Sequence, residues 1–198
     1  RLSFFQLSKD KIFSFQQQLS KAIDFECFSA SHLLQPKVFL RVRPAAENQV
    51  AKKLSSIPEA VLTGRYTIEL PPAFPVEEYF MIEKEVVVQD KNSQNTSGLF
   101  PQLPASPEIW DACAGSGGKS ILAADYYPGC KLTVSDIRAS ILKNLKKRFQ
   151  LAEIEPVHSF VVDLTRIKPA NNSYRFIIAD VPCTGSGTWG RSPEQLLY

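Results

Sequence analysis

The second half of the chain alternates short apolar runs with longer amphipathic stretches. The apolar runs are Ile109–Cys113, Lys131–Ser135, Ser159–Asp163 and Phe176–Val181, and helical stretches near 118–127 and 138–151 separate the first three. This alternation is typical of a parallel sheet with crossover helices. Acidic residues stand at the ends of three runs, namely Asp136, Asp163 and Asp180. Because ligands bind at the carboxyl ends of parallel strands, these acids are candidate ligand contacts.

The first half predicts a small α+β unit. Residues 9–23 have the pattern of an amphipathic helix, with Ile12, Phe15, Leu19 and Ile23 on one face. We expect strands at residues 37–43, 66–70 and 85–89 and a helix at residues 45–57. Residues 91–107 are polar and rich in Ser, Asn and Pro, so they form either a boundary or a short helix followed by a turn.

Composition adds little about partners, but the distribution of charge is informative. The net charge of +3 does not by itself indicate a nucleic-acid partner. Residues 37–65 carry six basic and two acidic side chains, and residues 137–150 carry five basic and no acidic ones. Each run is either a solvated face or a surface that contacts phosphate, and the sequence leaves both interpretations open.

Cysteine usage favours a reduced, cytoplasmic protein. The four cysteines are Cys27, Cys113, Cys130 and Cys183, and no two of them form a C-x-x-C pair. We therefore expect neither a metal site nor a disulfide framework. No apolar run approaches the roughly 20 residues that span a bilayer, and the N-terminus lacks the pattern of a signal peptide, so we expect no membrane partner.

A glycine-rich segment, DACAGSGGKS at residues 111–120, follows the first strand of the second half and opens a helix. Its end fits a phosphate-binding P-loop, but Cys113 stands where the leading glycine belongs. It fits a dinucleotide-binding G-x-G-x-x-G only in part, because Ser120 replaces the third glycine. An S-adenosylmethionine site needs a looser glycine turn and an acid after the second strand, which Asp136 supplies. A tight turn without a ligand is the remaining interpretation.

Two further motifs identify a family. The segment DVPCTGSGT occupies residues 180–188, and VQDKNSQ occupies residues 88–94. Together with DACAGSGGKS, they resemble the motifs D-x-C-A-x-P-G-G-K-T, D-A-P-C-S-G-x-G and V-Q-D-x-x-S-Q of the Sun/RsmB-type (NOL/NOP/Sun) RNA (cytosine-5)-methyltransferases. The three motifs occur in the family's order and spacing over about residues 85–194. The resemblance implies a Rossmann-like class I methyltransferase sheet, S-adenosylmethionine as cofactor and RNA as substrate.

The resemblance also implies roles for individual residues. Asp180 is the candidate acid that holds the cytosine edge, Lys119 lies near the target base, and Cys183 assists release of the product. The family's attacking cysteine belongs to a later Thr-Cys motif, which does not occur in this sequence. The candidate cofactor-binding residues are Asp111, Cys113, Ala114, Gly115, Ser116, Gly117, Gly118, Lys119, Asp136, Ile137, Asp163 and Asp180. Gly115 and Ser116 stand where the family usually has a small residue and Pro, which predicts a more flexible turn.

The family resemblance sets the domain prediction as well. We expect residues 1–96 to form the N-terminal α+β unit that binds RNA, with Arg41 and Arg43 as contacts. Residues 97–198 are expected to form the N-terminal half of the methyltransferase domain, with Arg191 as a further RNA contact. A complete sheet of this class has seven strands and the sequence predicts four, so we expect the gene product to be longer.

The predicted activity is methyl transfer to carbon 5 of a cytosine in RNA. Ribosomal RNA is favoured over transfer RNA, and the protein is expected to be monomeric. Two other functions stay open. One is a cofactor-binding RNA module that does not catalyse, because its nucleophile strand is missing. The other is a DNA cytosine-5 methyltransferase in which Cys183 attacks directly; the basic N-terminal unit argues mildly against it.

Overall fold

The computed structural model describes Phe13 and residues 16–166 and 173–192. The chain divides into two compact units, Lys37–Val181 and the described residues of Arg1–Pro36 and Pro182–Tyr198. Each unit is described separately below. The predicted domain boundary after residue 96 falls inside the larger unit, and the division into two functional domains remains a prediction.

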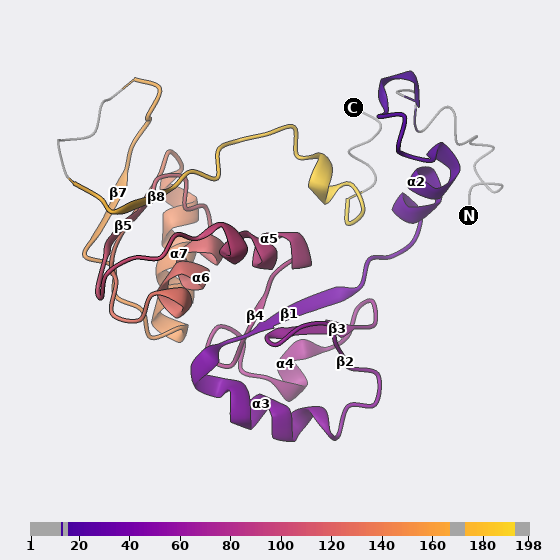
Figure 1. The fold of residues 1–198 in the computed structure, drawn as a ribbon, viewed down its shortest axis with the longest axis horizontal. Helices are drawn as coiled ribbons and strands as arrows, with labels where there is room; N and C mark the ends of the chain where they lie inside the picture. Colours follow the sequence, from indigo (N-terminus) through magenta and orange to yellow (C-terminus); the bar gives the residue numbers. More distant parts are fainter. Residues whose placement is uncertain (1–12, 14–15, 167–172, 193–198) are drawn as a thin grey trace. The chain divides into compact units, whose positions relative to one another are not determined.

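A four-stranded parallel sheet forms one part of the larger unit (Figure 1). Its strands are β5 (Glu108–Asp111), β6 (Lys131–Asp136), β7 (His158–Val161) and β8 (Phe176–Ile178), in the order β7-β6-β5-β8. The helices α6 (Gly118–Tyr126) and α7 (Ala139–Leu151) connect successive strands. Leu145 and Phe149 of α7 pack with Ile109 and Val134 of the sheet in one buried core. The predicted Rossmann-like α/β fold is confirmed.

A four-stranded antiparallel sheet forms the other part of the larger unit. Its strands are β1 (Val38–Val42), β2 (Val61–Leu62), β3 (Thr67–Leu70) and β4 (Val86–Val88), in the order β2-β3-β1-β4. The helices α3 (Glu47–Leu54) and α4 (Val76–Tyr79) belong to the same part. Val50 of α3 and Val76 of α4 pack with Leu40, Ile68 and Val86 of the sheet in a second core. The predicted α+β composition is confirmed.

The polar segment after β4 is a short helix and a turn. It forms α5 (Lys91–Asn95) and then a 3₁₀ helix, Thr96–Leu99. Gln94 is buried; its amide nitrogen donates to the Gln89 carbonyl at 2.7 Å, and its amide oxygen accepts from the Thr67 hydroxyl at 2.7 Å. The segment therefore belongs to the packing of the larger unit and does not act as a linker.

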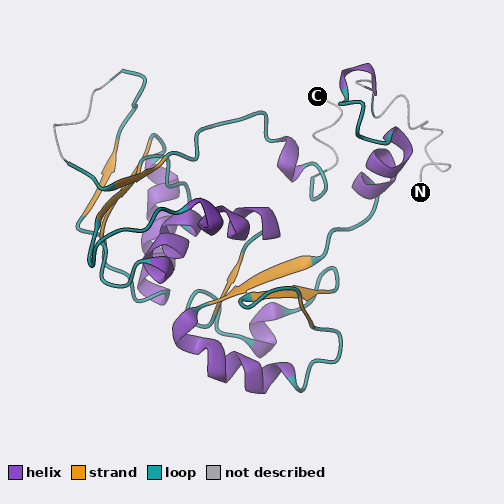
Figure 2. Cartoon of the chain, viewed as in Figure 1, coloured by secondary structure: helices purple, strands orange, loops and turns teal. Residues whose placement is uncertain are grey.

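The smaller unit differs from the sequence prediction. Part of the expected helix at residues 9–23 lies outside the described residues, and the described residues from 16 to 23 contain only the 3₁₀ helix Gln16–Gln18. Among the described residues of this unit, the α-helix is α2 (Phe25–His32), drawn in purple in Figure 2. It begins there because the Asp24 carboxylate caps it, accepting from the Cys27 N–H at 2.7 Å. A second 3₁₀ helix, Ser186–Thr188, lies in the C-terminal part of this unit.

Across the described ranges, no helix is long and apolar enough to cross a membrane.

Candidate functional site

The order of the parallel strands marks the edge between β5 and β8 as the expected place for a ligand. From β5 the chain continues outward to β6 and β7 and then returns to β8 on the opposite side of β5. In open α/β sheets the ligand binds where the strand order reverses in this way, outside the carboxyl ends of the strands. Asp111 ends β5, and Asp180 follows β8 by two residues. The motifs at residues 111–120 and 180–188 therefore begin at the same edge of the sheet.

The glycine loop turns tightly between β5 and α6. Gly115 has φ +53° and Gly117 has φ +90°, and Gly117 caps the start of α6. The Gly117 N–H donates to the Ala114 carbonyl at 2.8 Å, and the Ala114 N–H donates to the Ser135 carbonyl of β6 at 2.8 Å. A Cβ atom on Gly117 would lie 2.8 Å from Cε1 of Phe149. Gly117 is therefore required by its backbone conformation and by its contact with α7.

Asp136 joins the end of β6 to the glycine loop. Its carboxylate accepts from the Gly115 N–H at 2.9 Å and from both the N–H and the Nε of Arg138, at 2.9 and 3.1 Å. Burial acts to raise the pKa of this carboxyl group, but the hydrogen bonds from Arg138 and Gly115 outweigh it, and the pKa of Asp136 is lowered. Asp136 is therefore an anion held directly beside the turn.

Arg148 of α7 anchors the loop at Ser116. Its Nη1 lies 3.0 Å from both the carbonyl oxygen and the hydroxyl of Ser116, and its Nε donates to Glu83 at 2.7 Å. The Glu83 side chain is 7% exposed, so this ion pair is largely withdrawn from solvent. The sequence predicts a flexible turn where Ser116 replaces Pro. Two hydrogen bonds from a neighbouring helix restrain that position instead.

Asp111 is a buried acid at the end of β5. It is fully buried; its Oδ2 accepts from the Ser120 hydroxyl at 2.6 Å, and its Oδ1 has no hydrogen-bond partner among the described residues. Burial raises the pKa of Asp111 to about 6, against the opposing hydrogen bond from Ser120 and with added repulsion from Asp180. Asp111 is therefore an acid with a raised pKa at the carboxyl end of β5.

The titration of Asp111 should make stability depend on pH. Its folded pKa of about 6 lies above the ordinary value of 3.8. The folded state therefore binds this proton more tightly, and the resulting stabilisation is complete below pH 3.8 and lost as the pH rises through 6. Asp111→Asn does not titrate. From about pH 4 to about pH 7, urea unfolding should show the wild type losing about 2 to 3 kcal/mol relative to this variant. A constant difference between the two proteins would contradict the prediction.

Lys119 and Asp180 form an ion pair at the same edge of the sheet. The Lys119 ammonium donates to the Asp180 carboxylate at 2.6 Å, with 22% of the lysine side chain and 56% of the aspartate side chain exposed. Lys119 comes from the first turn of α6 and Asp180 from the segment after β8. The structure thus brings together two of the three predicted catalytic residues and leaves their polar ends open to solvent.

The other predicted cofactor residues lie around the same edge. Ile137 is 56% exposed directly after Asp136. Asp163 follows β7; its carboxylate accepts from the Thr165 N–H and hydroxyl, at 3.0 and 2.6 Å, and pairs with Arg166 at 3.2 Å. Cys113 is partly buried within the glycine loop, and burial raises the pKa of its thiol, which favours packing over reactivity. Among the described residues, no group of three or more potential ligands is placed to hold a metal ion.

The two arginines predicted to contact RNA have buried partners. The Asp125 carboxylate of α6 accepts from Arg41 Nη1 at 2.5 Å and from Arg43 Nη2 at 2.8 Å. Arg43 Nη1 also donates to the carbonyls of Glu83 and Ala152, at 3.0 and 2.6 Å. Both arginines lie on or beside β1 of the antiparallel sheet, whereas Asp125 supports the parallel sheet. This pairing favours a structural role for Arg41 and Arg43, which join the two sheets, over the predicted RNA contact.

Cys183 and Arg191 belong to the smaller unit. Both residues are exposed, and all four cysteines of the chain are free thiols. The Arg191 N–H donates to the Thr188 carbonyl at 2.9 Å. The predicted roles of Cys183 in product release and of Arg191 in RNA contact remain predictions.

Sequence reasoning missed three side chains that organise the site. They are Ser120, which binds Asp111; Arg138, which binds Asp136; and Arg148, which binds Ser116. Ser120 could have been found, because a hydroxyl one helical turn after the loop can reach the strand end. Arg138 could also have been found, because it lies two residues after Asp136 and can reach that carboxylate locally. Arg148 is 32 residues from Ser116, and no pattern in the sequence connects them.

Comparison with known proteins finds similarity to curated RNA methyltransferases. No family model matches it. It is 25% identical over 178 residues to ribosomal RNA small subunit methyltransferase B of Xanthomonas campestris, covering 81% of this chain and 39% of that protein. It is 29% identical over 122 residues to the 26S rRNA (cytosine-C(5))-methyltransferase nsun-5 of Caenorhabditis elegans, covering 59% of this chain and 28% of that protein. The chain thus spans less than half the length of these relatives.

A solved structure shows the same fold. The methyltransferase homologue protein from Pyrococcus horikoshii superposes with a TM-score of 0.69 at 18% identity, covering 95% of this chain and 63% of that one. At this identity the likeness establishes the fold alone. The Rossmann-like arrangement of the parallel sheet and the antiparallel sheet before it is therefore found in a solved protein.

Proposed function

We propose that this chain, a relative of the Sun/RsmB-type RNA (cytosine-5)-methyltransferases, holds the cofactor end of an enzyme that methylates carbon 5 of a cytosine in RNA. The proposed donor is S-adenosylmethionine, and ribosomal RNA is the favoured substrate over transfer RNA. One observation carries the proposal. The glycine turn held by Asp136 and the Lys119–Asp180 pair occupy the carboxyl edge of one parallel sheet.

The residues of the loop fit the proposed cofactor. No atom of the described residues lies within 4 Å of the position that a Cβ on Gly115 would take, so a ligand can approach the backbone there. The Asp136 carboxylate can accept hydrogen bonds from ribose hydroxyls once the 59% exposed Arg138 side chain moves aside. Ile137 offers an exposed apolar surface for the adenine ring, and Asp163 offers an acceptor for its amino group. When bound, S-adenosylmethionine supplies an electrophilic methyl group.

The Lys119–Asp180 pair fits the base-binding side of the reaction. Carbon 5 of cytosine is a poor nucleophile until a thiol adds to carbon 6, and a nearby acid must stabilise the ring nitrogen as charge develops. Asp180 can hold the cytosine edge, and Lys119 can hold Asp180 in position through their 2.6 Å contact. By the family resemblance, Cys183 assists release of the product, and the attacking thiol belongs to a later motif.

Cofactor binding tests the loop directly. Asp136→Asn keeps the shape of the side chain but removes its charge, so it should lower the affinity of the full chain for S-adenosylmethionine by about tenfold to a hundredfold. Isothermal titration calorimetry measures this, with the exposed Glu155→Gln as a matched control that should bind like the wild type. Equal affinities of Asp136→Asn and Glu155→Gln would reject Asp136 as a cofactor ligand.

Methyl transfer tests the reaction. Labelled S-adenosylmethionine is incubated with RNA and the complete product of the gene that encodes this chain, and the nucleosides are then analysed. A 5-methylcytidine signal in ribosomal RNA is the expected result. Cofactor binding without any methyl transfer to RNA would reject the proposed reaction and leave a non-catalytic module or a DNA substrate.

A further inference from the structure

A cavity lies in the larger unit, away from the glycine loop. It has a volume of about 510 Å³ and is bounded by the β2–β3 turn, α5 and the last turns of α6. Helix α6 has nine residues, so about 12 Å of helix separates Tyr126 at this cavity from Gly118 at the glycine loop. Of the predicted cofactor and catalytic residues, none lines this cavity. It is therefore a separate site.

The charges around the cavity favour an anion. Arg41, Arg65 and Lys91 line it, and Asp125 is the one acid among its described lining residues. The Asp125 carboxylate is already paired with Arg41 and Arg43, so it does not neutralise Arg65 or Lys91. The Arg65 side chain is 74% exposed. Among the described residues it forms one ion pair, a long 3.6 Å contact with Glu47. Guanidinium and ammonium groups bind phosphate, and Arg65 is exposed while Lys91 is partly exposed.

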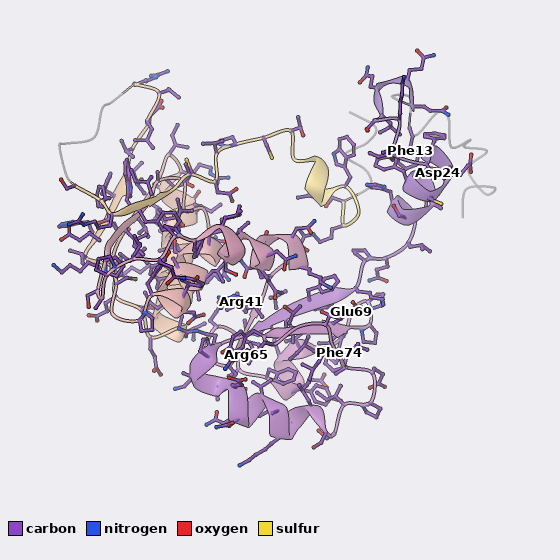
Figure 3. All side chains as sticks on the ribbon, viewed as in Figure 1. Phe13, Asp24, Arg41, Arg65, Glu69 and Phe74 are labelled. Carbon is purple, nitrogen blue, oxygen red and sulfur yellow. The ribbon has the colours of Figure 1, made fainter. Side chains whose placement is uncertain are left out.

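Aromatic and polar side chains complete the wall. Tyr66 and Tyr126 line the cavity, and Tyr126 is 40% exposed while its ring packs against Phe100. The Arg65 guanidinium lies 4.9 Å from the centre of the Tyr66 ring. Nucleic-acid bases stack on aromatic rings and on guanidinium planes of this kind. Asn95 and Ser97 supply donors and acceptors at the rim. Arg41 on β1 and Arg65, two residues before β3, are both labelled in Figure 3.

Two polar atoms of the wall lack a partner. Arg41 Nη2 and Thr63 Oγ1 are buried and have no hydrogen-bond partner among the described residues. Such atoms cost free energy unless a ligand or an ordered water satisfies them after a small movement of the side chain. Both residues line the cavity. A polar ligand in the cavity can reach these two atoms only after their side chains turn toward it.

We propose that this cavity binds a nucleoside phosphate, namely one nucleotide of the RNA strand, with its phosphate on Arg65 and Lys91 and its base against Tyr66 and Tyr126. The volume lies within the range of small-ligand pockets. The choice of RNA rests on the proposed function, whereas the choice of a nucleoside phosphate rests on the basic and aromatic residues that line the cavity. The cavity would hold a part of the substrate that is not the reacting cytosine.

The test uses the double variant Arg65→Gln/Lys91→Gln of the full chain. Fluorescence anisotropy measures the binding of a short labelled single-stranded oligoribonucleotide, and cytidine monophosphate serves as an unlabelled competitor. The matched control is Lys52→Gln/Lys147→Gln, which removes two exposed charges outside the cavity. Affinity for S-adenosylmethionine is measured in parallel and should be unchanged in both double variants, because the glycine loop is intact.

The expected result is about a tenfold weaker RNA affinity in the cavity variant. The slope of log affinity against log salt concentration should also become shallower by about 0.7 for each lost phosphate contact. The control variant should show a smaller loss. A cytidine monophosphate affinity that depends on Arg65 and Lys91, with RNA affinity unaffected, would identify a free nucleotide as the ligand. Equal RNA and cytidine monophosphate binding by the cavity and control variants would overturn the proposal. Methyl transfer, measured separately, would still decide the proposed function.

Discussion

Replacing Gly117 by Ala should destabilise the larger unit and abolish cofactor binding, although only one methyl group is added. The new Cβ would lie 2.8 Å from Cε1 of Phe149 and 3.1 Å from Cγ of Leu145, at a φ of +90°. Backbone strain and overpacking each cost about 1 to 3 kcal/mol, and here they act together. Because Gly117 also caps α6, relief of the clash must move the loop. We expect the affinity for S-adenosylmethionine to fall by about a hundredfold or more.

Gly115→Ala is the matched control for this prediction. Gly115 also has a positive φ, +53°, but its Cβ position has no neighbour within 4 Å in the part of the chain that the structure describes. The substitution should therefore cost only the strain of a left-handed residue, about 1 kcal/mol. Urea unfolding measures the stability of both variants. Similar losses of stability in the two variants would show that contact with α7 is not what requires glycine at position 117.

The parallel sheet and its loop could be predicted because their signals are local. Each strand is a short apolar run bounded by turn residues, and all four observed strands lie within a few residues of the predicted ones. The glycine loop and Asp136 were identifiable because the second strand must end beside the first in a parallel sheet. In the larger unit, the strand β2 and the α-helix α4 were missed because they have only two and four residues, too few to show any periodicity.

The roles of Arg41 and Arg43 could not be predicted, because their partner is distant in sequence. The strand alternates apolar and basic side chains, which is the usual pattern of a strand with one solvated face. The partner carboxylate, Asp125, stands 84 residues after Arg41, in the helix that follows the glycine loop. The sequence shows that residues 37–65 are basic, but only the three-dimensional packing decides which of those charges face solvent. Arg65 is exposed, whereas Arg41 is 4% exposed.

Asp125→Asn should destabilise the larger unit by about 3 to 5 kcal/mol, since removing one partner of a buried ion pair leaves uncompensated charge. The Asp125 carboxylate has 8% exposure, and its two arginine partners have 5% and 14%. The amide keeps the shape of the side chain but cannot neutralise two guanidinium groups. Chemical denaturation gives the difference in unfolding free energy. Glu108→Gln is the control, because its pair with Lys131 is about half exposed and should contribute less than about 1 kcal/mol.

The same variant separates the two roles considered for Arg41 and Arg43. If Arg41 and Arg43 join the two sheets, Asp125→Asn should lower the free energy of unfolding and should not raise the affinity for RNA. If their main role is contact with RNA phosphate, removal of the competing carboxylate should strengthen RNA binding while stability stays close to that of Glu108→Gln. The second result would reverse the structural role argued from the 2.5 and 2.8 Å contacts. It would also enlarge the proposed nucleotide site, because Arg41 already lines that cavity.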